Sequence, residues 1–272
     1  MGLCEMTNDI QQDTAAASVR IGNIVPSSNT VLEPIMAQIA MDVGGVSVHF
    51  SRLRVTEITL EEKGLRQFDI AKFVSAAQLL AEAKVDVIAW NGTSGSWLGL
   101  DYDRSICEAI TRNTGIPSTT STLAFHDMLP RLGIKRVGLI TPYTTDVQSR
   151  LMETWSRSGI TCVSERHLGL SENFAFQQVA GADIRRLADA VAEQECEAIV
   201  IVCTNVRGAL FAAELEERLK IPVIDSVSVT MRACLDMANH AFTDAPRWGT
   251  ILRRQDETMS RRSSSVPTAA AD

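Results

Sequence analysis

The chain contains two copies of one α/β pattern, and this internal repeat constrains its fold more than any other feature. Val19–Thr30 reads VRIGNIVPSSNT, and residues 136–146 read RVGLITPYTTD. Residues 86–94 (DVIAWNGTS) recur as residues 197–205 (EAIVIVCTN), and an Ile-Pro pair follows each of these segments further along. Matched segments in the same order indicate two related halves that face each other.

Short β-branched runs alternate with longer amphipathic stretches between the two ends of the chain. Strands are predicted at 19–25, 46–53, 85–90, 136–141, 161–166, 198–203 and 223–224. Helices are predicted at 30–41, 70–83, 100–114, 121–132, 145–158, 182–193, 208–219 and 226–241. Continuously apolar strands, each followed by a helix, are typical of parallel sheets covered on both faces. We therefore expect two pseudo-symmetric, doubly wound (Rossmann-like) α/β halves with the active site between them.

The repeat also divides the chain into domains. The first half is predicted at 19–132 and the second at 133–225, with 226–254 free to pack back on the first. The polar residues 1–18 and the Ser/Arg/Ala-rich residues 255–272 are predicted to be disordered tails.

Composition excludes several classes of partner. The net charge of -7 and the aromatic content of 5% disfavour nucleic acid, which needs a basic face and stacking platforms. No apolar run reaches the roughly 20 residues of a membrane-spanning helix, so no membrane partner is expected. The sequence leaves both a monomer and a homo-oligomer open.

Cysteine and histidine usage indicates a cytoplasmic protein with no metal. The first residues, MGLCEMTNDIQQD, lack the apolar core of a secretory signal. The six cysteines are scattered, with no C-x-x-C pair and no nearby histidine, which favours reduced thiols over disulfides or zinc. The four histidines share no ligand spacing.

Polar segments follow the predicted strands, where ligands bind in open α/β sheets. These segments are Pro26–Thr30, Asn91–Ser96, Ser118–Thr122, Pro142–Asp146, Cys203–Arg207 and Asp225–Ser228. If the halves face each other, the six segments line one cleft, which predicts a binding site for a small molecule.

Cys203 is the strongest catalytic candidate. It ends an apolar strand and precedes a predicted helix start, where unpaired N–H groups and the helix dipole lower a thiol pKa. The alternative is a buried structural cysteine. In the repeat, Cys203-Thr204-Asn205 opposes Gly92-Thr93-Ser94, so one half offers a thiol where the other offers only glycine.

The first-half loop around Gly92, Thr93 and Ser94 is expected to bind carboxylate oxygens, since glycine permits close approach and hydroxyls donate hydrogen bonds. It lacks the spacing of a P-loop or of a dinucleotide fingerprint, and a plain strand–helix turn is the alternative.

The segment after the first strand, with Pro26, Ser28 and Asn29, combines turn and helix-capping residues. Its position makes Asn29 a candidate carboxylate ligand. Tyr143 holds the matching place in the second copy, where a phenol donates a hydrogen bond without carrying charge.

Together, the motifs I-V-P-S-S-N-T, G-T-S, T-P-Y and C-T-N resemble the aspartate/glutamate racemase superfamily. Within it, the sequence is most similar to the branch of maleate cis–trans isomerases and arylmalonate decarboxylases. The resemblance extends from about residue 19 to residue 237. It implies an enzyme that needs neither cofactor nor metal and holds a small (di)carboxylic acid between two α/β halves.

The resemblance also assigns roles. Racemases and isomerases of this superfamily place one cysteine in each half, and the first would fall at Gly92. Decarboxylase-like members have glycine there and a single second-half cysteine. By that likeness Thr93, Ser94 and Tyr143 stabilise a carboxylate and the enediolate it becomes, and Cys203 protonates the enediolate.

Some residues match the isomerases instead. Thr204 stands where the decarboxylase-like pattern has glycine, so Cys203-Thr204-Asn205 is more isomerase-like. Asn29 and Asn173 resemble the asparagines that hold substrate carboxylates in isomerases. We expect a decarboxylase-like lyase with one catalytic cysteine. The alternatives are an isomerase or racemase with a non-cysteine second group, and a non-catalytic carboxylate-binding protein.

Overall fold

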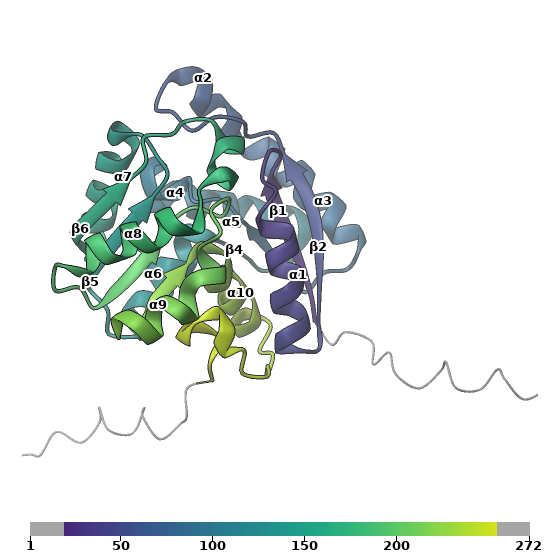
Figure 1. The fold of residues 1–272 in the computed structure, drawn as a ribbon. Helices are drawn as coiled ribbons and strands as arrows, with labels where there is room; N and C mark the ends of the chain where they lie inside the picture. Colours follow the sequence, from purple (N-terminus) through teal and green to yellow (C-terminus); the bar gives the residue numbers. More distant parts are fainter. Residues whose placement is uncertain (1–18, 255–272) are drawn as a thin grey trace, which may run out of the picture.

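Two four-stranded parallel sheets form the framework of the protein (Figure 1). A computed structural model describes residues 19–254, and both predicted tails lie outside this range. The first sheet has the order β2-β1-β3-β4 and the second β6-β5-β7-β8. The strands are β1 (Val19–Pro26), β2 (Val46–Leu53), β3 (Val87–Trp90), β4 (Ser118–Thr120), β5 (Arg136–Thr141), β6 (Thr161–His167), β7 (Ala198–Ile201) and β8 (Val223–Asp225). This arrangement confirms the predicted α/β class.

Helices cover the sheets and complete each half. The α-helices are α1 (Leu32–Val43), α2 (Glu62–Leu65), α3 (Ile70–Glu82), α4 (Gly95–Leu98), α5 (Leu100–Thr114), α6 (Ser121–Arg131), α7 (Thr145–Arg157), α8 (Gly181–Ala192), α9 (Ala212–Leu219) and α10 (Ser226–Met237). The 3₁₀ helices are η1 (Arg66–Phe68), η2 (Asn173–Gln178), η3 (Gly208–Phe211), η4 (Pro246–Trp248) and η5 (Thr250–Leu252). We call β1–β4 with their helices the first half and β5–β8 with theirs the second half.

The two halves repeat the same backbone hydrogen bonds at matched positions. Asn91 N donates to Ile24 O, and Val202 N donates to Ile140 O, each at 2.9 Å. An acidic side chain binds the backbone at the opposite end of each sheet, because Asp86 accepts from Arg20 N and its counterpart Glu197 accepts from Arg136 N. The internal repeat of the sequence is therefore a structural repeat.

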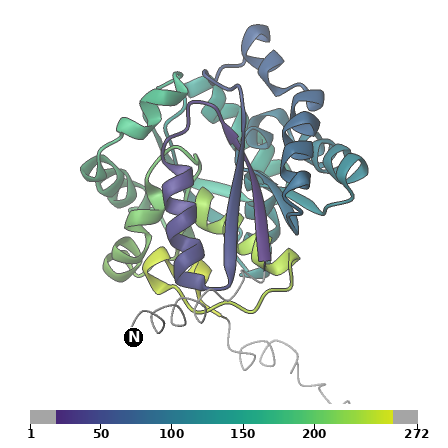
Figure 2. The same cartoon turned by 90° about the vertical axis from the view of Figure 1, so that its right-hand side faces the viewer.

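Two helices connect the halves. Figure 2 shows α1 beside the strands of the first sheet, with the green second-half helices on its other side. Helix α10 follows β8 of the second half, yet it packs against α1 and α6 of the first. The Asp225 carboxylate caps α10 by accepting from Val227 N at 2.8 Å and Ser228 N at 3.0 Å. Helix α10 therefore joins the carboxyl end of β8 to the helices of the first half.

Several predicted boundaries were wrong. Ser118–Thr120, predicted as a loop, forms β4 and pairs with β3, because three polar residues are too few to show a strand pattern. The strand predicted at 198–203 ends at Ile201, and the helix predicted at 208–219 is divided into η3 and α9. As a result Cys203 lies in a turn between β7 and η3, several residues before any α-helix begins.

Candidate active site

A cavity lies between the halves at the carboxyl ends of their strands. The space between its atoms is about 310 Å³ with the open mouth included, of which the centre of a water-sized sphere can occupy about 20 Å³. Its polar lining residues are Thr93, Ser94, Tyr143, Asn173, Cys203 and Thr204, and the rest of its wall is Pro26, Val55, Ile58, Phe68, Trp90, Gly92, Trp97 and Phe176. Among the described residues that line the cavity, none is a lysine, arginine, histidine, aspartate or glutamate. An anion held here therefore meets hydroxyl groups instead of a cationic side chain.

Thr93, Ser94, Tyr143 and Cys203 form what we call the polar end of the cavity. The Tyr143 hydroxyl lies 2.6 Å from Thr93 Oγ1 and also hydrogen-bonds the Cys203 thiol. Burial raises the pKa of Tyr143 well above its ordinary value, so the phenol stays neutral and keeps its proton. A chain of hydroxyls from the first half thus reaches the thiol of the second half.

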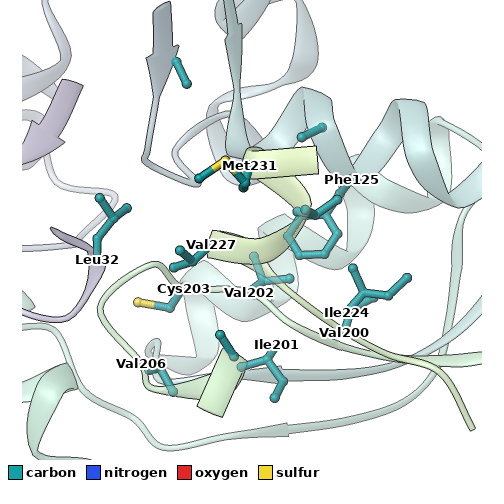
Figure 3. Close-up of a cluster of buried hydrophobic side chains, with 14 of the residues drawn as sticks. Leu32, Phe125, Val200, Ile201, Val202, Cys203, Val206, Ile224, Val227 and Met231 are labelled. Carbon is teal, nitrogen blue, oxygen red and sulfur yellow. The ribbon is translucent and has the colours of Figure 1, made fainter. Parts of the chain in front are cut away.

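Cys203 is buried, and its sulfur is held by the turn that follows β7. Figure 3 shows its side chain in a cluster with Val202, Val206 and Val227. Backbone N–H groups of Asn205 and Val206 hydrogen-bond the sulfur and lower its pKa, but the loss of hydration outweighs them and raises the pKa to about 12. The prediction of a lowered thiol pKa was wrong, because burial dominates and no α-helix starts at this turn. The resting group is a neutral thiol, which can donate a proton.

Gly92 occupies the matched position in the first half, and the indole of Trp90 covers it. A Cβ atom built on Gly92 would lie 2.1 Å from Cζ2 and 2.3 Å from Cε2 of Trp90. Real Cβ atoms do not approach other atoms so closely, so position 92 accepts only glycine while Trp90 keeps its place. Positions 92 and 203, which follow matched strand ends, therefore differ both in their side chain and in the space that is free for one.

A network of amides, which we call the seam, joins the halves beside the cavity. Thr204 Oγ1 donates to Asn91 O at 3.0 Å and accepts from Asn29 Nδ2 at 3.1 Å. Asn205 Nδ2 donates to Asn173 O at 2.6 Å, and Asn205 Oδ1 accepts from Thr30 N. The donors of these side chains are thus used to connect one half to the other.

Two further seam contacts involve residues predicted to bind substrate. Asn173 Nδ2 donates to Ser28 Oγ at 3.0 Å and to Val55 O at 3.3 Å, which uses both of its amide hydrogens. Asn29 Oδ1 caps α1 by accepting from Val31 N and Leu32 N. In this arrangement Asn29 and Asn173 stabilise the protein itself.

The structure brings most of the predicted site residues together. Pro26, Gly92, Thr93, Ser94, Tyr143, Asn173, Cys203 and Thr204 line the cavity, whereas Ser28, Asn29 and Asn205 lie in the seam next to it. Sequence reasoning missed the apolar wall: Val55, Ile58, Phe68, Trp90, Trp97 and Phe176. Trp90 alone carried a signal, since it lies two residues before Gly92 at the end of a predicted strand.

Part of the wall comes from two segments that pair across the halves. Ile58 N donates to Ser171 O at 2.8 Å, and Asn173 N donates to Thr56 O at 2.9 Å. Val55 and Ile58 of the first half and Phe176 of the second line the cavity beside this pairing. The cavity is consequently enclosed by both halves.

A buried carboxyl group supports the strand-end loop in each half. Asp103 accepts from Thr120 Oγ1 and touches Gly95, and burial raises its pKa to about 7. Asp225 is close to Gly208, and burial raises its pKa to about 6. Both groups are fully buried, so they act on the loops rather than on a bound ligand.

Residues 19–254 contain no cluster of three or more histidine, cysteine, aspartate or glutamate side chains arranged to hold a metal ion. Over the same range, no helix combines the length and the apolar character that a membrane crossing requires.

Comparison with known proteins places the chain. The sequence profile of the arylmalonate decarboxylase family matches residues 21–249. The chain belongs to the arylmalonate decarboxylase family. Within the aspartate/glutamate racemase superfamily, it lies in the branch of maleate isomerases and arylmalonate decarboxylases, as its motifs predicted. It is an enzyme of the isomerase and decarboxylase types found there, which act on small carboxylates without a cofactor.

Relatives of both types resemble the chain to a similar degree. A maleate isomerase of Geobacillus stearothermophilus is 27% identical over 253 residues, covering 87% of this chain and 98% of the relative. An arylmalonate decarboxylase of Bordetella bronchiseptica is 25% identical over 245 residues, covering 87% and 98%. The solved maleate isomerase Iso of Pseudomonas putida S16 has a TM-score of 0.80 at 26% identity, covering 86% and 98%. Overall similarity thus leaves the reaction within the family to be argued from the site.

Proposed function

We propose that this enzyme decarboxylates a malonate that carries an apolar substituent, with Cys203 as its one acid. The observation that carries the proposal is the asymmetry of the cavity. One end presents the hydroxyls of Thr93, Ser94 and Tyr143 together with the thiol, and the remaining wall is mostly apolar and aromatic. Such a cavity suits a substrate with one carboxylate bound by donors and a hydrophobic group opposite.

The apolar wall destabilises the second carboxylate of a bound malonate and so favours its loss as carbon dioxide. An ionised carboxylate among groups such as Val55, Ile58 and Phe68 loses its hydration without gaining a partner. Cleavage of the bond between the α-carbon and this carboxylate releases neutral carbon dioxide, which an apolar wall accommodates. The electron pair of the broken bond passes into an enediolate formed from the remaining carboxylate.

The polar end supports the next two steps. The Ser94 hydroxyl, whose proton is not used in its contact with Trp90, donates to the bound carboxylate and stabilises the charge that develops on the enediolate oxygens. Cys203 then transfers its thiol proton to the α-carbon, and the resulting thiolate is held by the N–H groups of Asn205 and Val206 and by the Tyr143 hydroxyl. A proton from solvent restores the thiol, so the net change replaces a carboxylate by hydrogen.

Maleate isomerisation is the second candidate function, favoured by Thr204 and by the maleate isomerase relatives. Two features oppose it. The matched first-half position is Gly92, which has neither a thiol nor room for one. The amide hydrogens of Asn173 are both engaged within the protein, which leaves the cavity without this donor for a second carboxylate.

An activity assay separates the two reactions. Purified enzyme is incubated with phenylmalonate, the simplest arylmalonate, and separately with maleate, and both reactions are followed by NMR. We expect carbon dioxide release and phenylacetate from the first and no fumarate from the second. Conversion of maleate to fumarate with phenylmalonate untouched would overturn the proposal in favour of the isomerase.

We also propose a cytoplasmic location, supported by cysteines that suit a reducing compartment. Cys107, Cys162, Cys196, Cys203 and Cys234 are free thiols. Cell fractionation of the native host tests it, and recovery in a secreted fraction would contradict it.

A further inference from the structure

The indole of Trp90 is held on two sides beside Gly92. Its Nε1–H donates to Ser94 Oγ at 3.1 Å, and its ring packs edge-on against Phe73 with centroids 4.9 Å apart and an angle of 80°. Trp90 is 1% exposed, although its indole borders the cavity. An indole fixed in this way cannot yield to a new side chain as the end of a flexible chain would.

The matched position in the second half behaves differently. In the repeat, Trp90 corresponds to Ile201 as Gly92 corresponds to Cys203. The Ile201 side chain packs against Gly208, whose added Cβ would lie 2.9 Å from Ile201 Cγ2. Cys203 retains room to line the cavity. The size and direction of this one strand residue therefore decide whether the following loop has space for a thiol.

Trp90 also fixes the direction of a hydrogen bond at the polar end. An indole N–H can only donate, so Ser94 Oγ acts as the acceptor in their contact. The hydroxyl proton of Ser94 is left to donate elsewhere, and Ser94 lines the cavity. A carboxylate bound at the polar end can accept that proton.

We propose that Trp90 is a specificity-determining residue that limits the enzyme to delivering a proton from one side. It closes the first-half wall where a second thiol would have to stand and turns the Ser94 hydroxyl toward the substrate. This proposal rests on the proposed decarboxylation for its stereochemical consequence: the α-carbon receives its proton only from Cys203, and a prochiral malonate gives one enantiomer.

The first test measures the space beside Gly92 without using catalysis. The variants G92C and W90L/G92C are treated with iodoacetate, a small carboxylate that alkylates thiols, and labelling at position 92 is followed by peptide mass spectrometry. We expect labelling at least about tenfold faster in W90L/G92C, because Leu lacks the ring atoms that cover position 92. Equal labelling rates in the two variants would overturn the proposal.

A matched control excludes general loosening of the fold. Trp248 is also 1% exposed and donates its Nε1–H to a side chain, Asp42 Oδ2 at 2.7 Å, but it does not line the cavity. W248L/G92C should label as slowly as G92C. If it labels as fast as W90L/G92C, the effect of Trp90 is not local and the proposal fails. Should W90L/G92C not fold, W90F/G92C replaces it, because Phe also lacks Cζ2 and Nε1.

The second test measures the stereochemical consequence. The wild-type enzyme should convert 2-methyl-2-phenylmalonate to a single enantiomer of 2-phenylpropionate. W90L/G92C should racemise that product and exchange its α-proton in heavy water at least about tenfold faster than G92C. With thiols on both sides, one removes the α-proton while the other delivers one. Racemisation by G92C with Trp90 intact would contradict the proposal.

The two tests separate two kinds of failure. If the wild-type enzyme does not decarboxylate either malonate, the proposed function is wrong, and the labelling ratio still decides whether Trp90 excludes a second thiol. If decarboxylation proceeds but the labelling rates are equal, only the role of Trp90 is wrong.

Discussion

The loops after β3 and β7 begin at matched strand ends but carry out different tasks. Both contain threonine directly after the key position, at Thr93 and Thr204. Both threonines line the cavity, but Thr93 contacts Tyr143, whereas Thr204 is hydrogen-bonded to Asn29 and Asn91 in the seam. The comparison teaches that duplication reproduces the position of a side chain, while its neighbours decide whether it faces a substrate or holds the halves together.

The largest difference between the loops is the thiol, so its removal should have the largest effect. Cys203→Ser should lower kcat by about 10²–10⁴ because the main proton donor is lost, while substrate binding is retained. Steady-state kinetics and calorimetric titration measure the two quantities. Cys234→Ser is the control, since Cys234 is fully buried in α10 outside the cavity. Full activity of Cys203→Ser would show that the proton comes from another group.

The matched threonines offer a second way to test the comparison. Thr93→Val removes the hydroxyl that hydrogen-bonds Tyr143 and so disturbs the phenol that holds the Cys203 thiolate, which should lower kcat by about 10²–10³. Thr204→Val leaves Asn91 O and Asn29 Nδ2 without their partner, at a cost of about 1–3 kcal/mol in the free energy of unfolding. We therefore expect Thr93→Val to affect chiefly kcat, and Thr204→Val to affect chiefly the unfolding temperature. Kinetics and calorimetry on both variants measure this, and the reverse pattern would refute the assigned roles.

Burial of the thiol predicts an unusual pH profile. The protonated thiol is the active form, so activity is lost as pH rises through the pKa of Cys203. Burial raises that pKa from 9.0 to about 12, so kcat/KM should not fall between pH 7 and pH 9 through ionisation of this thiol. Initial rates with phenylmalonate across this range test the prediction. A decline that follows the titration of an ordinary thiol would mean that the sulfur is better hydrated than its position indicates.

The smallest expected effect concerns the carboxyl groups beneath the loops. Burial raises the pKa of Asp103 from 3.8 to about 7, so the folded protein keeps a proton that the unfolded chain releases. The free energy of unfolding should therefore fall as pH rises from about 4 to about 7, by this group's contribution. Asp103→Asn should remove that contribution, which unfolding curves at several pH values would reveal. If the free energy of unfolding of Asp103→Asn depends on pH as it does in the wild type, a group other than Asp103 carries the raised pKa.

The sequence was sufficient for the features that depend on the course of the backbone. Parallel strands are recognised by their continuous apolar character and by the helix that follows each one, and their carboxyl ends lie at the same edge of a sheet. Thr93, Tyr143 and Cys203 were therefore expected to be close before their contacts were known. The short strand Ser118–Thr120 escaped because its pairing with β3 depends on distant residues.

Features that depend on side-chain direction and burial could not be predicted. The pKa of Cys203 results from competition between local N–H donors and lost hydration, and only the packed structure shows which is larger. The amides of Asn29 and Asn173 could bind substrate or protein with equal chemistry, and their partners come from the other half. The contact between Trp90 and Gly92 likewise requires knowing which way the indole turns.

The central claim is that one thiol acts on one side of the substrate, and decarboxylation of 2-methyl-2-phenylmalonate in heavy water tests it most directly. The account predicts carbon dioxide and 2-phenylpropionate with a single α-deuterium and a single configuration, with no further exchange when the product is incubated again with enzyme. Racemic product, or continued α-exchange by the wild-type enzyme, would contradict it by requiring a second proton-transfer group.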